Sequence, residues 1–268
     1  MSNEKDCIIV IPVYKSLNMN DKVVINQAMA MTPGIDKVFI MPQSFIPDNS
    51  FNDFTDLGVE RFDDHFFAGI LGYNRLMVSI DFYKRFSDYR FMLIHQTDAF
   101  LFKPDLQYWC DKNYDYIGAP WLRPHKLKLA RIYSFLLNVS PWVYSDHRRK
   151  KIRHYNNVGN GGLSLRKIES FIKILEFPGT QNILNSYLEK QVSGDSIYNE
   201  DVFWSLEGRR LYKNFRKPHW REALYFSLEM YPSFGYDLMD QQLPFGCHAP
   251  FVHGAEFWKD HLPFDKPE

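Results

Sequence analysis

Four short stretches of the chain carry side chains that could do chemistry. The first is Gln96-Thr97-Asp98, where a lone carboxylate follows the apolar run RFMLI. Oxygen ligands of this kind suit a hard divalent cation, although an aspartate after a strand can equally cap a turn or a helix. The position of Asp98 alone therefore leaves a metal site and a structural cap both open.

The second stretch is rich in glycine, because Gly159, Gly161 and Gly162 surround Asn160 just before the run LSLR. Glycines permit positive φ and the close approach of backbone to a ligand, whereas a hairpin or bulge is the structural alternative. Neither a GKS or GKT triplet nor GxGxxG spacing is present, so the stretch is not a P-loop or a dinucleotide fingerprint. We expect it to lie near a ligand.

The third stretch is the acidic pair Glu200-Asp201, which opens the helical pattern EDVFWSL. Acids in a first helical turn are commonly placed there by the helix dipole, so the pair alone indicates no function. The fourth is His248 in PFGCH, among aromatic residues near the end of the chain. A lone histidine is more often structural, but neutral imidazole is also a good ligand for a manganese-like ion.

The elements that must position these residues alternate between strand and helix. Short apolar runs typical of buried strands occupy residues 7–13, 37–41 and 90–94, and we expect further strands at residues 59–62, 114–117 and 162–166. Helical spacing covers residues 23–31, 69–86, 167–177, 181–191 and 200–209, and the chain from residue 218 onward is expected to be rich in loops. Asp98 then lies beyond the carboxyl end of a strand, where ligands bind in open α/β sheets.

Taken in order, these motifs resemble the GT-A glycosyltransferases, and most closely a bacterial family of that fold long classed as a domain of unknown function. The resemblance runs from IVIPVYK through FFAGILGYNRLMVSIDFYKRF, LIHQTDAFLF, DYIGAPW, VGNGGLSLR and NEDVFW to PFGCHA, so it covers nearly the whole chain. It implies one GT-A-like domain over residues 1–268. The implied fold is Rossmann-like, with a mixed, mainly parallel central sheet flanked by helices.

The resemblance implies a metal site. Asp98 stands at the metal-binding DxD position and His248 at the C-terminal metal ligand, so these two residues would hold Mn²⁺ or Mg²⁺, with Gln96 and Thr97 beside the donor. Gln96 replaces the usual first aspartate of DxD. The ion therefore has one carboxylate fewer, and we expect it to be held weakly or to arrive with the donor.

The other motifs acquire roles from the same resemblance. Gly161 and Gly162 would lie beside the donor. Asp201, with Glu200 as the alternative, would be a general base that takes the proton of the acceptor hydroxyl, which implies inversion at the sugar.

Two further segments lie where a GT-A fold binds the nucleotide. Tyr14 and Lys15 follow the first strand, and Tyr73, Asn74 and Arg75 lie in LGYNRL. Tyrosine and asparagine can stack on and hydrogen-bond to a uracil-like base, and Arg75 or Lys15 could meet phosphate. The structural alternative for LGYNRL is the start of a helix with a buried tyrosine.

Composition limits the remaining possibilities. Lys plus Arg equals Asp plus Glu at 32 each, so no overall field favours nucleic acid. Three cysteines without CxxC spacing argue against a disulfide framework or a structural zinc site. The N-terminus lacks the layout of a signal peptide, and no apolar run reaches the ~18 residues of a spanning helix. We therefore expect a cytoplasmic protein, or one peripheral on the inner face of the cytoplasmic membrane.

One segment departs from this neutrality. A basic and aromatic insertion is expected at about residues 123–155, and between Arg123 and Arg153 nine Lys or Arg stand against one acid, Asp146. Such a segment can dock on an anionic membrane and bring the enzyme to a lipid-linked acceptor. A solvated acceptor loop or an oligomer contact is the alternative.

The function that these observations favour is transfer of a sugar from a nucleotide-sugar, expected to be a UDP-sugar, to a hydroxyl of a cell-surface glycan, lipopolysaccharide or lipid-linked acceptor. A nucleotidyltransferase making activated sugars is one alternative, but its glycine-rich, lysine-containing N-terminal signature is not seen. A non-catalytic carbohydrate-binding protein would use the six Trp and sixteen Tyr as stacking surfaces. It would leave Asp98, Asp201 and His248 without a shared purpose.

Overall fold

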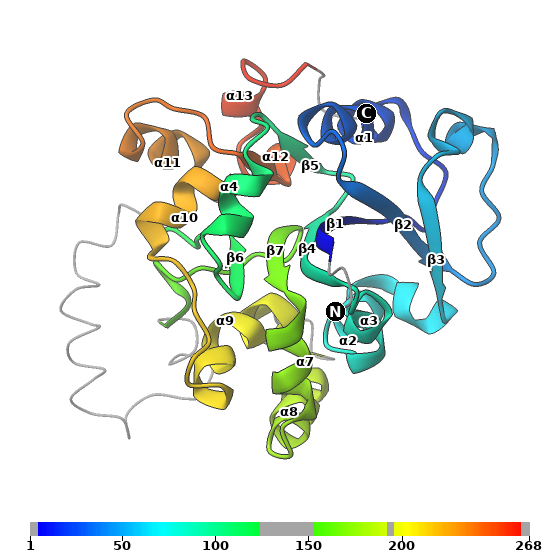
Figure 1. Cartoon of the computed structure of the whole chain (residues 1–268). Helices are drawn as coiled ribbons and strands as arrows, with labels where there is room; N and C mark the ends of the chain where they lie inside the picture. The colour runs from blue at the N-terminus through cyan, green and yellow to red at the C-terminus, as the bar shows by residue number, and fades with distance from the viewer. Residues whose placement is uncertain (1–4, 124–152, 192–195, 264–268) are drawn as a thin grey trace.

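A six-stranded sheet forms the centre of the protein, in a computed structural model that describes residues 5–123, 153–191 and 196–263 (Figure 1). The strand order is β3-β2-β1-β4-β7-β6. Strands β1 to β4 are parallel to one another, whereas β7 is antiparallel to both β4 and β6. The mixed, mainly parallel sheet is therefore confirmed. The bounds are β1 Lys5–Pro12, β2 Asp36–Pro42, β3 Gly58–Phe62, β4 Tyr89–His95, β6 Tyr116–Gly118 and β7 Leu163–Lys167.

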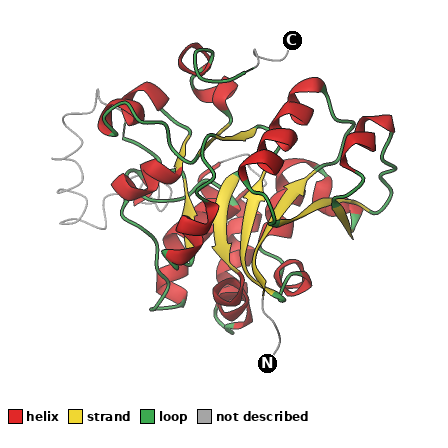
Figure 2. Cartoon of the chain, turned by 45° about the horizontal axis from the view of Figure 1, so that its top comes forward, coloured by secondary structure: helices red, strands yellow, loops and turns green. Residues whose placement is uncertain are grey.

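Helices cover both faces of this sheet and give three layers (Figure 2). One face packs on α1 (Met19–Met31), the 3-10 helix η1 (Asn49–Phe54), α4 (Leu106–Asp111) and α10 (Trp220–Phe226). The other packs on α2 (Gly69–Met77), α3 (Ile80–Arg85), α7 (Ile168–Glu176), α8 (Thr180–Gln191) and α9 (Glu200–Leu211). Two more 3-10 helices are η2 (Asp64–Phe67) and η3 (Ser196–Tyr198).

Strands β1, β2 and β4 are apolar over most of their length because both faces of the sheet are buried there. In β1, Ile9 and Ile11 face the first helical layer, and Ile8 and Val10 face the second. None of the four is more than 5% exposed. Continuous apolar runs are typical of such strands, which explains why the sequence predicted these three.

The single helix predicted over residues 69–86 is wrong, because the chain forms α2 and α3 with a break between them. The carbonyl oxygen of Met77 accepts hydrogen bonds from the Tyr83 hydroxyl at 2.8 Å and from Trp204 Nε1 at 3.2 Å. These side chains replace the backbone donor that a continuous helix would supply. Trp204 lies on α9, so local periodicity could not reveal the break.

The chain from residue 218, expected to be rich in loops, also contains several short helices and strands. This part forms α10, α11 (Pro232–Leu238), α12 (Pro250–His253), α13 (Ala255–Trp258) and the strands β8 (Ser227–Leu228) and β9 (Gly246–His248). Together with β5 (Ala99–Leu101), β8 and β9 make a second sheet of order β5-β9-β8. Elements of two to seven residues are too short to show a periodic signal.

The second sheet places two distant segments side by side. Strands β5 and β9 are antiparallel, with Ala99 opposite His248, and the backbone N–H of Ala249 donates to the carbonyl of Asp98 at 3.1 Å. A separation of about 150 residues in sequence is thereby closed at the carboxyl end of β4. This pairing is what brings Asp98 to His248.

Most of the basic insertion expected at residues 123–155 lies outside the described residues, at 124–152. Within the described ranges, no helix combines the length and apolar character needed to cross a membrane.

Candidate functional site

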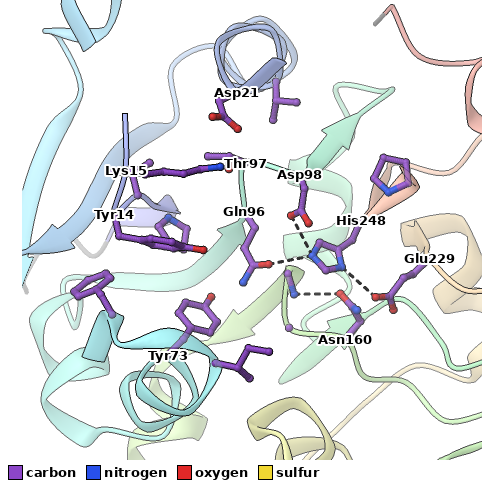
Figure 3. Close-up of a pocket in the computed structure, with 18 of the residues that line it drawn as sticks. Tyr14, Lys15, Asp21, Tyr73, Gln96, Thr97, Asp98, Asn160, Glu229 and His248 are labelled. Atoms are coloured by element: carbon purple, nitrogen blue, oxygen red, sulfur yellow. Dashed lines mark hydrogen bonds and ion pairs between the residues drawn. The ribbon is translucent and has the colours of Figure 1, made fainter. Parts of the chain in front are cut away.

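A pocket of about 800 Å³ opens beyond the carboxyl ends of β1 and β4 (Figure 3). Of the thirteen site residues predicted from the sequence, twelve line it: Tyr14, Lys15, Tyr73, Asn74, Gln96, Thr97, Asp98, Gly161, Gly162, Glu200, Asp201 and His248. The structure does not bring Arg75 to this pocket. Its side chain is exposed, because Asn74 takes the inward face of α2.

On one wall of the pocket, two side-chain oxygens lie close to the imidazole of His248. Its Nε2 lies 3.0 Å from Gln96 Oε1 and 3.2 Å from Asp98 Oδ1. Adjacent ligands of an octahedral ion with metal–ligand distances of about 2.1 Å lie about 3.0 Å apart, so both separations fit neighbouring positions around one ion. The carboxylate of Asp98 thus faces another side chain of the pocket, which does not favour the cap interpretation.

The protein supplies only part of a coordination shell at this wall. Among residues 5–123, 153–191 and 196–263, no group of three His, Cys, Asp or Glu side chains is placed to hold a metal ion. Asp98 and His248 are two side chains of these types, and Gln96 adds a neutral oxygen. Further ligands would have to come from water or from a bound phosphate.

At this wall the imidazole of His248 lies between two carboxylates, those of Asp98 and Glu229. Burial alone would lower the pKa of His248, but the carboxylates of Asp98 and Glu229 raise it to about 10. Burial likewise opposes ionisation of Asp98, but contact with His248 lowers the pKa of that carboxyl below its usual value. A cation bound here would replace the proton on Nε2, since a metal ligates neutral imidazole.

Glu229 is a member of this wall that the sequence did not indicate. Its Oε1 lies 3.2 Å from His248 Nδ1, and its side chain is only 9% exposed. A carboxylate on Nδ1 fixes the tautomer of a ligating histidine and leaves Nε2 directed at the ion. The run YFSLEMYP that holds Glu229 has no recognisable motif. Only the β8–β9 pairing places it behind His248.

Replacing Glu229 by Gln is expected to weaken Mn²⁺ binding about ten- to a hundred-fold, because His248 loses the charge that orients it and makes it basic. Titration of free Mn²⁺ by electron paramagnetic resonance, with UDP present, measures this affinity. Glu222→Gln is the matched control, since Glu222 pairs with Lys112 away from the pocket. Equal affinities in the two variants would contradict the role of Glu229.

The glycine loop makes room for side chains of other segments. A Cβ on Gly161 would lie 2.2 Å from Glu200 Oε1, and one on Gly162 would lie 1.9 Å from His248 Nε2. Neither glycine uses the positive φ that glycine permits, and Asn160 is the left-handed residue of the loop at φ 66°. The Asn160 side chain accepts from the Gly162 N–H at 3.1 Å. The glycines are thus required for close approach.

The two acids that open α9 differ in their surroundings. Glu200 accepts hydrogen bonds from both terminal nitrogens of Arg166, at 2.9 and 3.1 Å, and the two side chains are at most 3% exposed. Its carboxylate is therefore engaged in a structural ion pair.

Asp201 has no cationic partner among the described residues, and its Oδ1 accepts only from the Val202 N–H at 2.7 Å. Burial, together with repulsion from Glu200 and Glu229, raises the pKa of Asp201 to about 7. A carboxylate with this pKa can accept a proton near neutral pH. Of the two acids, Asp201 has the properties of a general base.

Among the remaining predicted residues, one has a structural role and two have side chains that could contact a ligand. Asn74 Oδ1 accepts from the Glu200 N–H at 3.0 Å and its Nδ2 donates to Asn199 at 3.4 Å, so Asn74 joins α2 to the start of α9. The Tyr73 hydroxyl is buried without a hydrogen-bond partner in the described part of the chain, and it points into the pocket (Figure 3). Tyr14 is 58% exposed at the opening. A ligand could hydrogen-bond to the Tyr73 hydroxyl and stack on the ring of Tyr14.

Solved structures with similar folds are glycosyltransferases. The apo-form glycosyltransferase GlyE of Streptococcus pneumoniae TIGR4 is similar at a TM-score of 0.52 and 10% identity, over 98% of this chain and 57% of that chain. An active-site mutant of LgtC is similar at a TM-score of 0.52 and 13% identity, over 90% of this chain and 86% of that chain. These likenesses confirm the GT-A fold. No curated protein matches the sequence. A family described as "Protein of unknown function (DUF5672)" matches residues 56–248.

Proposed function

Because the chain belongs to the family described as "Protein of unknown function (DUF5672)", whose description assigns no activity, we propose its function from the pocket: it is a glycosyltransferase that moves a sugar from a nucleotide-sugar to a hydroxyl group. One observation carries the proposal. In a GT-A fold, the Asp98 carboxylate lies 3.2 Å from the His248 imidazole, and both line the same pocket as Asp201, a carboxylate with a pKa of about 7.

The donor occupies the part of the pocket between Tyr14 and His248. Asp98 and His248, with Gln96 beside them, would hold Mn²⁺ or Mg²⁺. A divalent ion supplies charge that stabilises the leaving diphosphate. The exposed ring of Tyr14 stacks on the base, which we propose is uracil, and Lys15 meets phosphate oxygens.

On the acceptor side, Asp201 takes the proton of the attacking hydroxyl. The hydroxyl oxygen forms the new bond to the anomeric carbon while the carbon–oxygen bond to the diphosphate breaks, and that electron pair leaves with the phosphate. Direct attack on the face opposite the leaving group inverts the anomeric centre. Proton NMR of the product reports its configuration, and retention would exclude this mechanism.

The acceptor is proposed to be a bacterial cell-surface glycan or a lipid-linked precursor. The basic composition of residues 123–153 supports this class, because nine cations against one acid suit contact with anionic lipid. The enzyme would then work in the cytoplasm, at the inner face of the cytoplasmic membrane.

In a panel of nucleotide-sugars, we expect the unaltered protein to release nucleoside diphosphate from one donor. Removing the metal or Asp98 should strongly slow this release. We expect Asp98→Ala, or EDTA on the unaltered protein, to lower the rate at least about a hundred-fold, because charge on the leaving group is no longer balanced. Coupled-enzyme detection of UDP or GDP measures the rate. Asp88→Ala, at an exposed position, is the control.

The same assay separates the other function classes. Pyrophosphate in place of a nucleoside diphosphate would indicate nucleotidyl transfer. Silence across the panel, with no donor binding by calorimetry, would indicate a non-catalytic carbohydrate-binding protein.

A further inference from the structure

A second pocket, of about 550 Å³, is lined by side chains of one charge sign. It lies at the carboxyl end of α9, and its lining includes Asn157, Arg209, Lys213, Asn214, Arg216 and Lys217, with no Asp or Glu. The whole chain carries 32 cations and 32 acids. Four cations in one hollow are therefore a local concentration, in a molecule without an overall positive field.

Lys217 forms no ion pair with a carboxylate among the described residues. Its Nζ donates to Asn157 Oδ1 at 2.7 Å, Ser205 Oγ at 2.9 Å and the Ser205 carbonyl at 2.5 Å, all of them uncharged acceptors. Burial lowers the pKa of Lys217 to about 7. An anion bound beside it would favour the charged ammonium.

Arg209 and Lys213 are exposed and form no ion pair among the described residues. Arg210, between them in sequence, pairs with Glu207 and does not line the pocket. The dipole of α9 favours cations at its carboxyl end, which gives Arg209 a structural reason to be there. The dipole does not account for Lys217, which lies beyond the helix and is drawn inward.

We propose that this pocket binds a phosphate group carried by an anionic ligand. Arginine offers paired N–H donors and lysine a compact ammonium, and the two together match the oxygens of a phosphate monoester or diester. A volume of about 550 Å³ leaves room for a sugar or glycerol attached to the phosphate. Asn157 and Asn214 supply polar contacts for such an attached group.

An anionic lipid headgroup is the source that the surroundings favour. Asn157 Nδ2 donates to the Arg153 carbonyl at 3.4 Å, and the Arg123 N–H donates to Asn156 Oδ1 at 3.2 Å. Both ends of the basic segment thus meet the chain beside the pocket. A soluble phosphorylated glycan has the same chemistry and is the other source.

The site is separate from the transfer site. Asp201 and Arg209 are eight residues apart on α9, which corresponds to about 12 Å along the helix axis. Binding at this pocket can therefore be measured without any donor, and failure of the phosphate site would leave the proposed transferase activity untouched.

The test compares the full chain with Arg209→Ala/Lys213→Ala and with the control Lys5→Ala/Lys84→Ala. The control removes the same charge from exposed ion pairs elsewhere. Co-sedimentation with phosphatidylcholine vesicles, with and without 30% phosphatidylglycerol as a probe, measures lipid binding, and calorimetry with inorganic phosphate measures the soluble ligand. At about 1 kcal/mol per cation near a membrane, the pocket variant should bind anionic vesicles about thirty-fold more weakly than the control.

Each outcome decides something. Weaker binding of both probes by the pocket variant supports a lipid headgroup. Weaker binding of phosphate alone, with no binding of anionic vesicles by the unaltered protein, supports a soluble phosphorylated ligand. Equal binding of both probes by the two variants, each with an unchanged melting temperature, overturns the proposal.

Discussion

Replacement of Asp201 by Asn is expected to slow sugar transfer about 10²- to 10⁴-fold, the usual contribution of a general base. Asparagine keeps the shape of the side chain but cannot accept the proton. Donor binding should be unchanged, because we propose Asp201 to act on the acceptor hydroxyl and not to hold the ion or the donor. Product chromatography measures transfer, and calorimetry with the donor and Mn²⁺ measures binding.

The pH dependence of activity and of stability provides a control for the role of Asp201. The unaltered enzyme should gain activity as pH rises to about 7 and then level off, because the base must be ionised and its pKa is about 7. A raised carboxyl pKa also means that ionisation costs folding stability. The free energy of unfolding should therefore fall between about pH 4 and pH 7, and Asp201→Asn should remove this fall. A variant that is stable and still transfers sugar at the original rate would exclude Asp201 as the base.

Replacement of Arg166 by Met is expected to lower the free energy of unfolding by about 3–5 kcal/mol, because it leaves the buried carboxylate of Glu200 without its partner. Arg166 also donates to Ser164 Oγ at 3.0 Å and to the Tyr83 hydroxyl at 2.9 Å, so three polar groups lose a donor. Urea unfolding followed by circular dichroism measures the loss.

Two controls isolate the unpaired charge. Burial already raises the pKa of Glu200 against the opposing effect of Arg166, so without Arg166 the carboxyl should protonate more readily. The deficit of Arg166→Met should then shrink as pH falls towards 5. Arg210→Met removes an exposed arginine that pairs with Glu207 on the same helix, and it should cost under about 1 kcal/mol. Equal losses in the two arginine variants would contradict the account of Glu200.

The layers of the fold could be predicted because sheet burial leaves a local mark on the sequence. Strands buried on both faces are apolar at successive positions, as in β1, and each helix carries its own periodicity. The end of α2 and the second sheet could not be predicted. Both depend on partners distant in sequence, namely Trp204 bonded to the Met77 carbonyl and β9 paired with β5.

In the candidate site, too, the residues marked by local motifs could be predicted and those placed by distant pairing could not. Residues within motifs, such as Asp98 and Asp201, were found because a short pattern or a family resemblance marks them. Glu229 was missed because its position behind His248 arises only from tertiary pairing. Arg75 was placed at the donor because LGYNRL names adjacent residues without saying which face of α2 each occupies.

The lack of space at Gly162 makes the residues allowed at position 162 depend on the residue at position 248. The ring of His248 fills the space that any side chain at residue 162 would need. A descendant that gains alanine at 162 must displace the imidazole, whereas one that first loses the histidine is released from the demand for glycine. The order of substitution is therefore constrained. Homologues should not combine a histidine at 248 with a side chain at 162.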